Sequence, residues 1–393
     1  MADQKITELT ENTTPLGTDL LALVDDPAGT PATQKIKLDT LANLFTNNSM
    51  ARQAIINGNF DVWQRGVSLT PGETATLFIA DRWKIQQGAD GGTLPTVVHS
   101  RQLLTSGALY GSFYCYRVAP NGAGTSFGAG SYGWIEQRIE NGVRNLCGDG
   151  KKVTVSFWAK SDIANKKIGI WALQNYGTGG SPSAAETLNG ANWTLTSTWT
   201  KYTYTFTTNT LASKTFGTAF DDYLRIGIAY QWNTTYDERV GASTSEDYVG
   251  SGTIDIAQVQ LCAGDVALPF MPKSFAQELQ DCMRYYEKSY EYAVVPGTAT
   301  YYGASMVRAL NASSGQKYFT TKYKVNKRIA ATPSYWDTAG NASKVTTRDI
   351  DAAETSNVTP TGLDVVSQTG FAAYIVASTV CGIEFQWAVS AEL

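Results

Sequence analysis

The chain has 393 residues, enough for two or three domains with a sizeable core. Its formal net charge is −4 and only 17% of its residues are charged, with no basic patch, which argues against nucleic acid as a ligand. No stretch has the apolar length needed to insert in a membrane, and no signal-peptide core is present. The 21 Tyr, 10 Trp and 36 Gly favour a sheet-rich protein with tight turns.

The five cysteines predict neither a disulfide framework nor a zinc motif, because their number is odd and their spacing is scattered. We expect buried thiols in a protein that is assembled in a reducing cytosol. They are Cys115, Cys147, Cys262, Cys282 and Cys381.

Residues 1–50 differ from the rest of the chain in having neither Trp nor Tyr. The run DLLALVDDPAGTPATQKIKLDTLANLF (19–45) predicts a strand, a turn, a second strand and a short helix that Asp39 can cap. So small a unit cannot bury much surface alone, so we expect it to pack on copies of itself or on a larger assembly. The alternative is an unstructured tail.

Residues 51–272 predict a jelly-roll β-sandwich that begins with the turn-rich stretch IINGNFDVWQRG (55–66). Apolar residues alternate over 153–160, 201–207, 223–232 and 252–261, as in half-buried antiparallel strands. In the third run, alternation places Leu224, Ile226, Ile228, Tyr230 and Trp232 on one face. Two long loops, 174–193 and 233–252, interrupt this domain, and loops of such length are usually functional or disordered.

Residues 273–291 predict a linker helix, because apolar residues in KSFAQELQDCMRYYEKSY recur at helical spacing and Ser274 with Gln277 makes a capping box. Its apolar stripe could bury on its own domain or against the same helix in other subunits. Residues 292–393 return to strand patterns and predict a smaller distal β domain. The fold class is therefore all-β: a jelly-roll sandwich with a small N-terminal attachment segment and a smaller C-terminal β domain joined by a short helix.

Three segments together resemble virion proteins of tailed bacteriophages. KITELTENTTPLGTDLLALVDDPAGTPATQKIKLDTL resembles the virion-proximal segment of tail fibre and tailspike proteins. NGNFDVWQRG…ADRW…VSFWAK…IDIAQVQLCAGDVALPF…CMRYYEKSY resembles a carbohydrate-binding-like sandwich of phage structural proteins, and RIAATP…GF…FQWAVSAEL is similar to the module that follows it. The resemblance implies a homotrimer in the virion tail, assembled in the host bacterial cytoplasm, with residues 1–50 contacting other virion proteins.

The sandwich is also similar to carbohydrate modules that hold a structural calcium ion. The matching positions are Asp61 in NGNFD and Asp255 in TIDIAQ, and loop carbonyls would supply the remaining oxygens. The alternative is that Asp61 caps a turn and Asp255 faces water. No cofactor is otherwise required.

The sequence gives little support to an enzyme. His99 is the only imidazole that could activate a nucleophile. Because it lies in a stretch with strand alternation, a structural role is the simpler explanation for this histidine. Tailspike glycosidases use two carboxylates, for which Asp237, Glu238, Glu246 and Asp247 are candidates. Without a repeat typical of a β-helix, solvated loop charges are the simpler interpretation, and we predict no enzymatic activity.

Sugar binding needs exposed aromatic rings beside hydrogen-bonding groups. The long loops and the turn PSYWDTAGN (333–341) supply such groups, whereas we expect Trp63, Trp83 and Trp158 in the core. The predicted function is adhesion of a tail fibre or related receptor-binding component to host-surface polysaccharide through multivalent weak contacts. The alternatives are a purely structural fibre, decoration or baseplate component and a polysaccharide depolymerase. The glycan-binding candidates are Tyr176, Trp193, Trp232, Tyr236, Asp237, Arg239, Tyr248, Tyr335 and Trp336.

Overall fold

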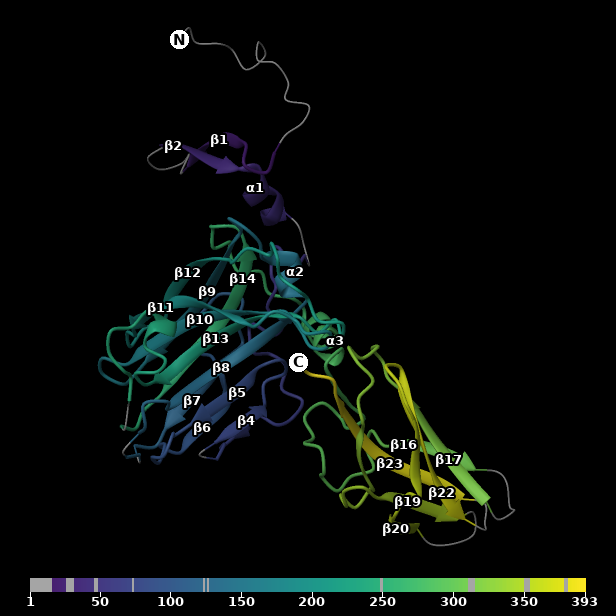
Figure 1. Ribbon diagram of the computed structural model, residues 1–393. Helices are drawn as coiled ribbons and strands as arrows, with labels where there is room; N and C mark the ends of the chain where they lie inside the picture. The colour runs from purple at the N-terminus through teal and green to yellow at the C-terminus, as the bar shows by residue number, and fades with distance from the viewer. Residues whose placement is uncertain are drawn as a thin grey trace.

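The computed structural model has a small N-terminal unit, a two-sheet sandwich and a smaller distal β domain, in chain order (Figure 1). Antiparallel sheets dominate and the helices are few and short, so the all-β prediction is confirmed. The structure describes residues 16–25, 32–45, 49–72, 74–122, 124–125, 127–247, 250–309, 315–349, 354–377 and 381–393.

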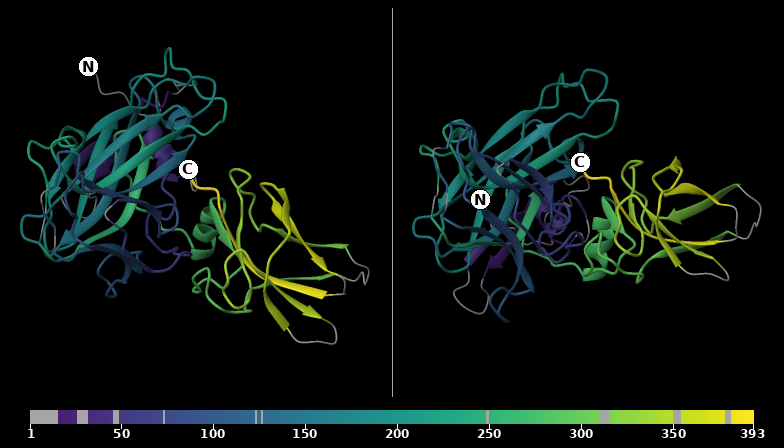
Figure 2. Two further views of the ribbon diagram at one scale, coloured as in Figure 1. Left: turned by 60° about the horizontal axis from the view of Figure 1, so that its bottom comes forward. Right: turned by 90° about the horizontal axis from the view of Figure 1, so that it is seen from below.

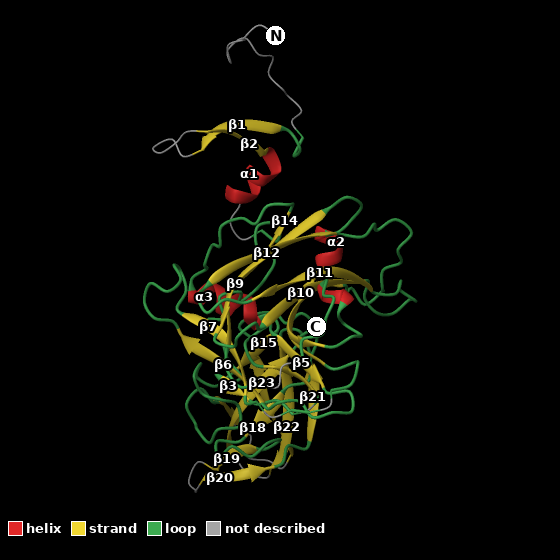
Figure 3. Cartoon of the chain, turned by 90° about the vertical axis from the view of Figure 1, so that its left-hand side faces the viewer, coloured by secondary structure: helices red, strands yellow, loops and turns green. Residues whose placement is uncertain are grey.

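The N-terminal unit is the predicted strand, strand and helix. Strands β1 (Leu20–Asp25) and β2 (Ala32–Lys37) pair antiparallel, and α1 (Leu38–Phe45) follows directly. The unit stands apart from the sandwich (Figure 3), and Lys37 reaches Asp265 at 2.8 Å. Leu20 and Leu21 are exposed, as expected of a unit too small to bury its own apolar side chains.

The sandwich consists of two six-stranded antiparallel sheets. The first sheet has the order β11-β10-β13-β8-β5-β4 and the second has the order β12-β9-β14-β7-β6-β3. One short helix, α2 (Gly142–Leu146), follows β8. The strands are β3 (Ser68–Leu69), β4 (Ala75–Phe78), β5 (Lys84–Gly88), β6 (Val97–Leu103), β7 (Tyr114–Pro120), β8 (Tyr132–Glu140), β9 (Lys152–Ser161), β10 (Lys167–Asn175), β11 (Glu186–Thr194), β12 (Thr200–Thr207), β13 (Tyr223–Trp232) and β14 (Ile254–Ala263).

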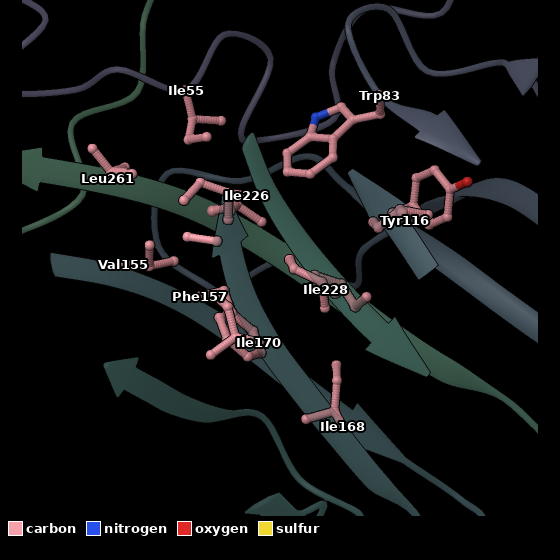
Figure 4. Close-up of a cluster of buried hydrophobic side chains, with 14 of the residues drawn as sticks. Ile55, Trp83, Tyr116, Val155, Phe157, Ile168, Ile170, Ile226, Ile228 and Leu261 are labelled. Carbon is pink, nitrogen blue, oxygen red and sulfur yellow. The ribbon is translucent and has the colours of Figure 1, made fainter. Parts of the chain in front are cut away.

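The core lies between these sheets, where alternate side chains of facing strands meet. Figure 4 shows Val155 and Phe157 of β9 among isoleucines of β10 and β13, and each such buried side chain stabilises the fold by about 1.5–3 kcal/mol. Trp63 and Trp83 are buried as predicted. Trp158 was predicted in the core but lies half-buried on the outer face of the second sheet, because its neighbour Phe157 takes the inner position.

The end predicted for the first long loop is wrong, whereas the second long loop lies between β13 and β14 as predicted. Residues 186–194 form β11, which pairs with β10 and closes one edge of the first sheet, so the first loop covers only 176–185. The second loop contains a 3-10 turn, η2 (Glu238–Val240), and β14 begins at Ile254.

The predicted linker helix is also shorter than expected. Helix α3 (Phe275–Met283) begins at the predicted cap, where the Ser274 side chain accepts a hydrogen bond from the Gln277 N–H at 3.3 Å. It ends well before residue 291, and β15 (Tyr286–Lys288) then pairs with the last strand of the distal domain. Cys282 is buried, so part of the helix packs within its own chain.

The distal domain packs a sheet built around β23 against the three-stranded sheet β17-β22-β21. As predicted, Ile383, Phe385, Trp387 and Val389 share the buried face of β23. The strands are β16 (Ser305–Ala309), β17 (Gly315–Lys322), β18 (Ser334–Trp336), β19 (Val345–Asp349), β20 (Glu354–Val358), β21 (Gly362–Val366), β22 (Gly370–Ala377) and β23 (Cys381–Ser390).

The stretch 55–66 forms the junction between sandwich and distal domain, beyond its predicted role of opening the sandwich. Asn57 adopts a left-handed conformation (φ 57°), and its amide group donates to the Val62 and Asp81 carbonyls at 2.8 and 3.0 Å. This turn positions Gln64, whose backbone and side-chain N–H groups donate to the buried Asp81 carboxylate at 3.1 and 2.5 Å. Gln64 also donates to the Tyr286 carbonyl at 3.0 Å, which ties the turn to β15.

Two arginines of the sandwich meet the C-terminal residues of the chain at this junction. Arg65 and Arg82 both pair with the Glu392 carboxylate, the former at 3.0 Å. Their guanidinium groups lie 3.6 Å from the Tyr286 ring centroid and 3.5 Å from that of Tyr285, respectively. Figures 1 and 2 show the C-terminus beside the junction.

Replacing Glu392 tests this junction. Glu392→Ala should lower the free energy of unfolding by about 3 kcal/mol, because it leaves the buried Arg82 guanidinium without its carboxylate and leaves Arg65 with Asp81 alone. Urea unfolding measures the change, with Glu291→Ala on the surface as the matched control. A loss no larger than that of the control would contradict the junction's energetic role.

The buried Asp81 carboxyl makes the stability depend on pH. Burial raises its pKa from 3.8 to about 6, against the lowering effect of Arg65 and Gln64. The folded chain therefore keeps a proton that the unfolded chain releases between about pH 4 and 6, so this contribution to stability is lost as the pH rises through that range. Relative to Asp81→Asn, the wild-type free energy of unfolding should fall by roughly 2.5 kcal/mol from pH 4 to 7.

The measurement is urea unfolding of both proteins across this pH range. Asp364→Asn, which removes an exposed carboxylate of the distal domain, is the matched control. If the free energies of unfolding of wild type and Asp81→Asn differed by the same amount at every pH, Asp81 would titrate normally.

Candidate functional site

The outer face of the first sheet carries a cluster of aromatic residues, called here the aromatic face: Tyr132, Trp134, Trp171, Trp232 and Tyr236. Alternation along β8 points Tyr132 and Trp134 away from the core, where their rings stack with centroids 4.2 Å apart.

Trp171 lies on this face because β13 has a glycine beside it. In the pairing of β10 with β13, Trp171 is opposite Gly227. A Cβ atom on Gly227 would lie 2.3 Å from the indole ring, so the ring can lie over the strand only because that position is glycine.

A β-bulge places Trp232 on the aromatic face as well. The pairing of β13 with β8 shifts between Ala229 and Gln231, and an extra residue at a bulge redirects the side chains that follow it. Tyr230 still points into the core, whereas Trp232 joins the outer cluster. The prediction that Trp232 shares a face with Ile226 and Ile228 is therefore wrong.

The second loop contributes Tyr236 and Arg239 to this face. The Tyr236 ring lies 5.5 Å from Tyr132 and 5.3 Å from Trp134, edge-on to both. The Arg239 guanidinium lies 4.7 Å from the ring centroids of both Trp171 and Tyr236. Such cation–π contacts contribute about 0.5–2 kcal/mol each and hold the loop on the sheet.

The loop carboxylates considered for glycoside hydrolysis are engaged in holding the loop. Glu246 pairs with the buried Lys166 at 2.8 Å, and Asp247 accepts from the Asn233 amide at 2.8 Å. Asp237 accepts from Ser245 Oγ at 3.3 Å, and Glu238 accepts from Asn189 at 3.1 Å. Each of the four carboxylates thus has a donor within the protein.

A polar group borders the aromatic face on β8 and β13. The buried Glu136 carboxylate accepts from the Trp134 indole N–H at 3.1 Å, and Arg138 and Arg225 lie 3.3 and 3.4 Å from it. Among the described residues, Trp171 Nε1 and Arg225 Nε are buried donors without a hydrogen-bond partner. The half-buried rings of Tyr132 and Tyr236 offer a stacking surface of the kind that a sugar uses, whereas Glu136 and the two unpaired donors lie buried beneath it.

The structure brings together four of the predicted glycan-binding residues: Trp232, Tyr236, Asp237 and Arg239. Trp232 is fully buried, so it supports the face from below and cannot contact a ligand.

The remaining candidates lie elsewhere. Tyr176 is a core residue whose hydroxyl donates to Glu186, and Trp193 packs on Phe157 in the core of the sandwich. The prediction for Tyr176 is wrong, because a ring that flanks a loop can still close the core, whereas Trp193 is half-buried at the edge of the core and stays a prediction. Tyr335 packs on the distal core, Trp336 lies half-buried against Tyr290, and Tyr248 lies outside the described residues.

Sequence reasoning missed Tyr132, Trp134 and Trp171. The signal for the first two was the alternation of Tyr132, Trp134 and Glu136 with Gly133 and Ile135. The pairing that places Trp171 over Gly227 has no local signal, because it joins two strands far apart in sequence.

The two predicted calcium ligands are not equivalent. Asp255 is buried, and Arg117 donates to its two oxygens at 2.6 and 2.8 Å. Asp255 therefore does not face water, and its oxygens are not free to bind calcium. Both expectations for this residue, a calcium ligand or a solvated carboxylate, are corrected. Asp61 accepts from the Asn59 amide at 3.0 Å, and burial raises its pKa. Within the described ranges, no group of three or more His, Cys, Asp or Glu side chains could hold a metal ion.

His99 is a core residue, as the strand pattern indicated. Its ring nitrogens lie 3.0 Å from the Tyr116 hydroxyl and 3.4 Å from that of Tyr230, and burial lowers its pKa to about 3. The described cysteines, Cys115, Cys147, Cys262 and Cys282, are buried free thiols. The side chain of Cys381 lies outside the described part of the chain.

No family model and no curated protein matches the sequence. Among solved structures, a CBM4 protein is 18% identical with a TM-score of 0.30, over 53% of this chain and 98% of its own. A putative sugar binding protein from Bacteroides thetaiotaomicron is 16% identical with a TM-score of 0.32, over 54% of this chain and 100% of its own. A CBM22 xylan-binding domain from Paenibacillus barcinonensis is 16% identical with a TM-score of 0.26, over 47% of this chain and 92% of its own. These likenesses concern the β-sandwich fold alone.

None of the helices in the described ranges has the length and apolarity to cross a membrane.

The pairing of Asp255 with Arg117 leads to a test for calcium. Because Arg117 already neutralises this carboxylate, a chelator should leave the melting temperature unchanged. Asp255→Asn should lower the free energy of unfolding by about 2 kcal/mol through the loss of a charged hydrogen-bond pair, with the exposed Asp149→Asn as control. A melting temperature that falls with chelator and recovers with calcium would contradict this assignment.

Proposed function

We propose that this protein is a non-enzymatic carbohydrate-binding protein and that the aromatic face of the sandwich is its binding surface. The observation that carries the proposal is the stacking of Tyr132 on Trp134, with Tyr236 and Arg239 beside them, on the outer face of a sheet. Aromatic rings on an inner face stabilise a core, whereas these rings add nothing to the packing between the two sheets.

The half-exposed members of the face would contact the sugar. Tyr132, Tyr236 and Arg239 are each partly accessible, whereas Trp134 and Trp171 lie beneath them and fix their positions. Sugar C–H groups would pack on the two tyrosine rings. Gln86, which is opposite Trp134 on β5, and Arg239 would supply hydrogen bonds to hydroxyl groups.

The biological setting of the proposal is the tail of a bacteriophage. Resemblance of residues 5–41 to virion-attachment segments supports a tail fibre or related receptor-binding component, present as a homotrimer and directed at host-surface polysaccharide. Several weak sites on one particle would reach useful avidity without tight binding at any one of them. A purely structural role in the virion is the competing proposal, and the aromatic face favours adhesion over it.

A non-enzymatic function is supported by the state of the ionisable groups described above. The only histidine is a buried neutral core residue, and the loop carboxylates have donors that hold them in structural contacts. Contacts of this kind favour a structural role for the loop carboxylates over a role as acid and nucleophile.

A glycan array with the full chain tests the proposal. Wild-type protein should bind a subset of bacterial polysaccharides, and Tyr236→Ala and Arg239→Ala should each weaken binding at least tenfold, about 1.4 kcal/mol. Tyr302→Ala, which removes an exposed ring of the distal domain, is the matched control and should bind normally.

Two outcomes would contradict the proposal. Silence of the wild-type protein across the array would favour the structural role, and unchanged binding by both variants would move the site away from the aromatic face. Incubation with a bound polysaccharide should release no reducing ends, and their appearance would identify a depolymerase.

A further inference from the structure

The distal domain has a hollow on the outer face of its larger sheet, called here the distal hollow. It has a volume of about 380 Å³ and is lined by Met306, Val307, Arg308, Arg348, Gly382 and Glu384. Figure 1 shows β16, β23 and β19 in the distal domain, where β16 and β19 pair with β23 on its two sides. Because residues of all three strands line it, the hollow lies over β23 in the middle.

The pairing places two arginines on either side of a glycine. Gly382 is opposite Arg308 in one neighbouring strand and Arg348 in the other. Since neighbouring strands lie about 4.8 Å apart, the α-carbons of the two arginines are roughly 10 Å apart across a position without a side chain. Two residues further along β23, Glu384 is opposite Met306 of β16.

Nothing in the backbone requires glycine at position 382. A Cβ atom there would meet only the backbone oxygen of Arg348 at 3.6 Å and its Cβ at 3.9 Å, which are ordinary contacts. Gly382 is also not among the residues with positive φ. Glycine weakens a strand relative to residues with side chains, so its effect here is to leave the hollow open.

The charges around the hollow favour an anion. Arg348 pairs with Glu384 at 2.9 Å, so Arg308 is the guanidinium of the lining that has no carboxylate partner among the described side chains. Arg308 is exposed and has no salt-bridge partner among the described residues. A guanidinium group binds a carboxylate in a bidentate manner.

Met306 and Glu384 narrow the class of anion. The Met306 side chain is 68% exposed at the rim, and a thioether chain of this kind offers a flexible apolar surface to a sugar ring. The Glu384 carboxylate, 5% exposed, can accept from a hydroxyl group while Arg348 holds it in place. We propose that the distal hollow binds a carboxylate-bearing sugar, with Arg308 on the carboxylate, Met306 on the ring and Glu384 on a hydroxyl.

This proposal is independent of the aromatic face, and Met306 provides a local reporter. In full-length protein labelled with 13C at the methionine methyl groups, methyl glucuronide should shift the Met306 signal, which Met306→Leu identifies. Methyl glucoside, which lacks the carboxylate, should bind at least tenfold more weakly. Arg308→Gln and Gly382→Val should each weaken glucuronide binding at least tenfold. The first removes the positive charge, and the second places a side chain in the hollow.

Lys322→Gln removes one exposed positive charge from β17 in the other sheet and should bind glucuronide normally. Arg239→Ala should also leave the Met306 shift unchanged, so failure of the sandwich site would not be mistaken for failure of this one. Equal shifts from methyl glucoside would overturn the role of the carboxylate, and equal binding of inorganic sulfate would overturn the role of the sugar. Unchanged binding by both Arg308→Gln and Gly382→Val would place the ligand outside the hollow.

Discussion

The shared Glu392 carboxylate between Arg65 and Arg82 is the contact on which the arrangement of the two large domains depends. Both arginines come from the short region that also contains the Asn57 turn and Asp81, so the start of the sandwich and the end of the chain meet in one buried polar network. A buried charge of this kind is costly when unpaired. The chain therefore has to complete β23, its last strand, before the junction can form, and this couples the two domains over more than three hundred residues of sequence.

The two faces of β13 illustrate how one strand can serve both the core and the surface. Ile226 and Ile228 fill the inner face, whereas Gly227 and Ala229 are small enough for the outer rings to lie against the sheet. The bulge after Ala229 then redirects Trp232 outward. Small residues and a bulge are therefore what convert a strand of a sandwich into the floor of an aromatic surface.

Sequence patterns were sufficient for the features that depend on neighbouring residues. Alternation identified the inner faces of β9, β13 and β23, and the cap at Ser274 followed from its spacing to Gln277. Features that depend on pairing between distant strands could not be predicted in this way. The partners of Asp255 and Trp171 come from other strands, and only the register of the sheets brings Arg117 or Gly227 beside them. The prediction for Trp232 failed for a second reason, because a single extra residue in β13 reverses the faces that a period of two assigns.

The junction also bears on how the two proposed ligand surfaces of the chain would act together. A second binding event gains from the first only when the connection between the sites matches the spacing of the groups they bind. A flexible linker would sample many spacings between the two surfaces, each at a low effective concentration. A junction held by Gln64, Arg65 and Arg82 limits the chain to few such spacings. A polysaccharide with a regular repeat presents its acidic and neutral sugars at fixed intervals. A rigid pair of surfaces would therefore select for the repeat length as well as for the sugars themselves, which is a specificity that neither surface could provide alone.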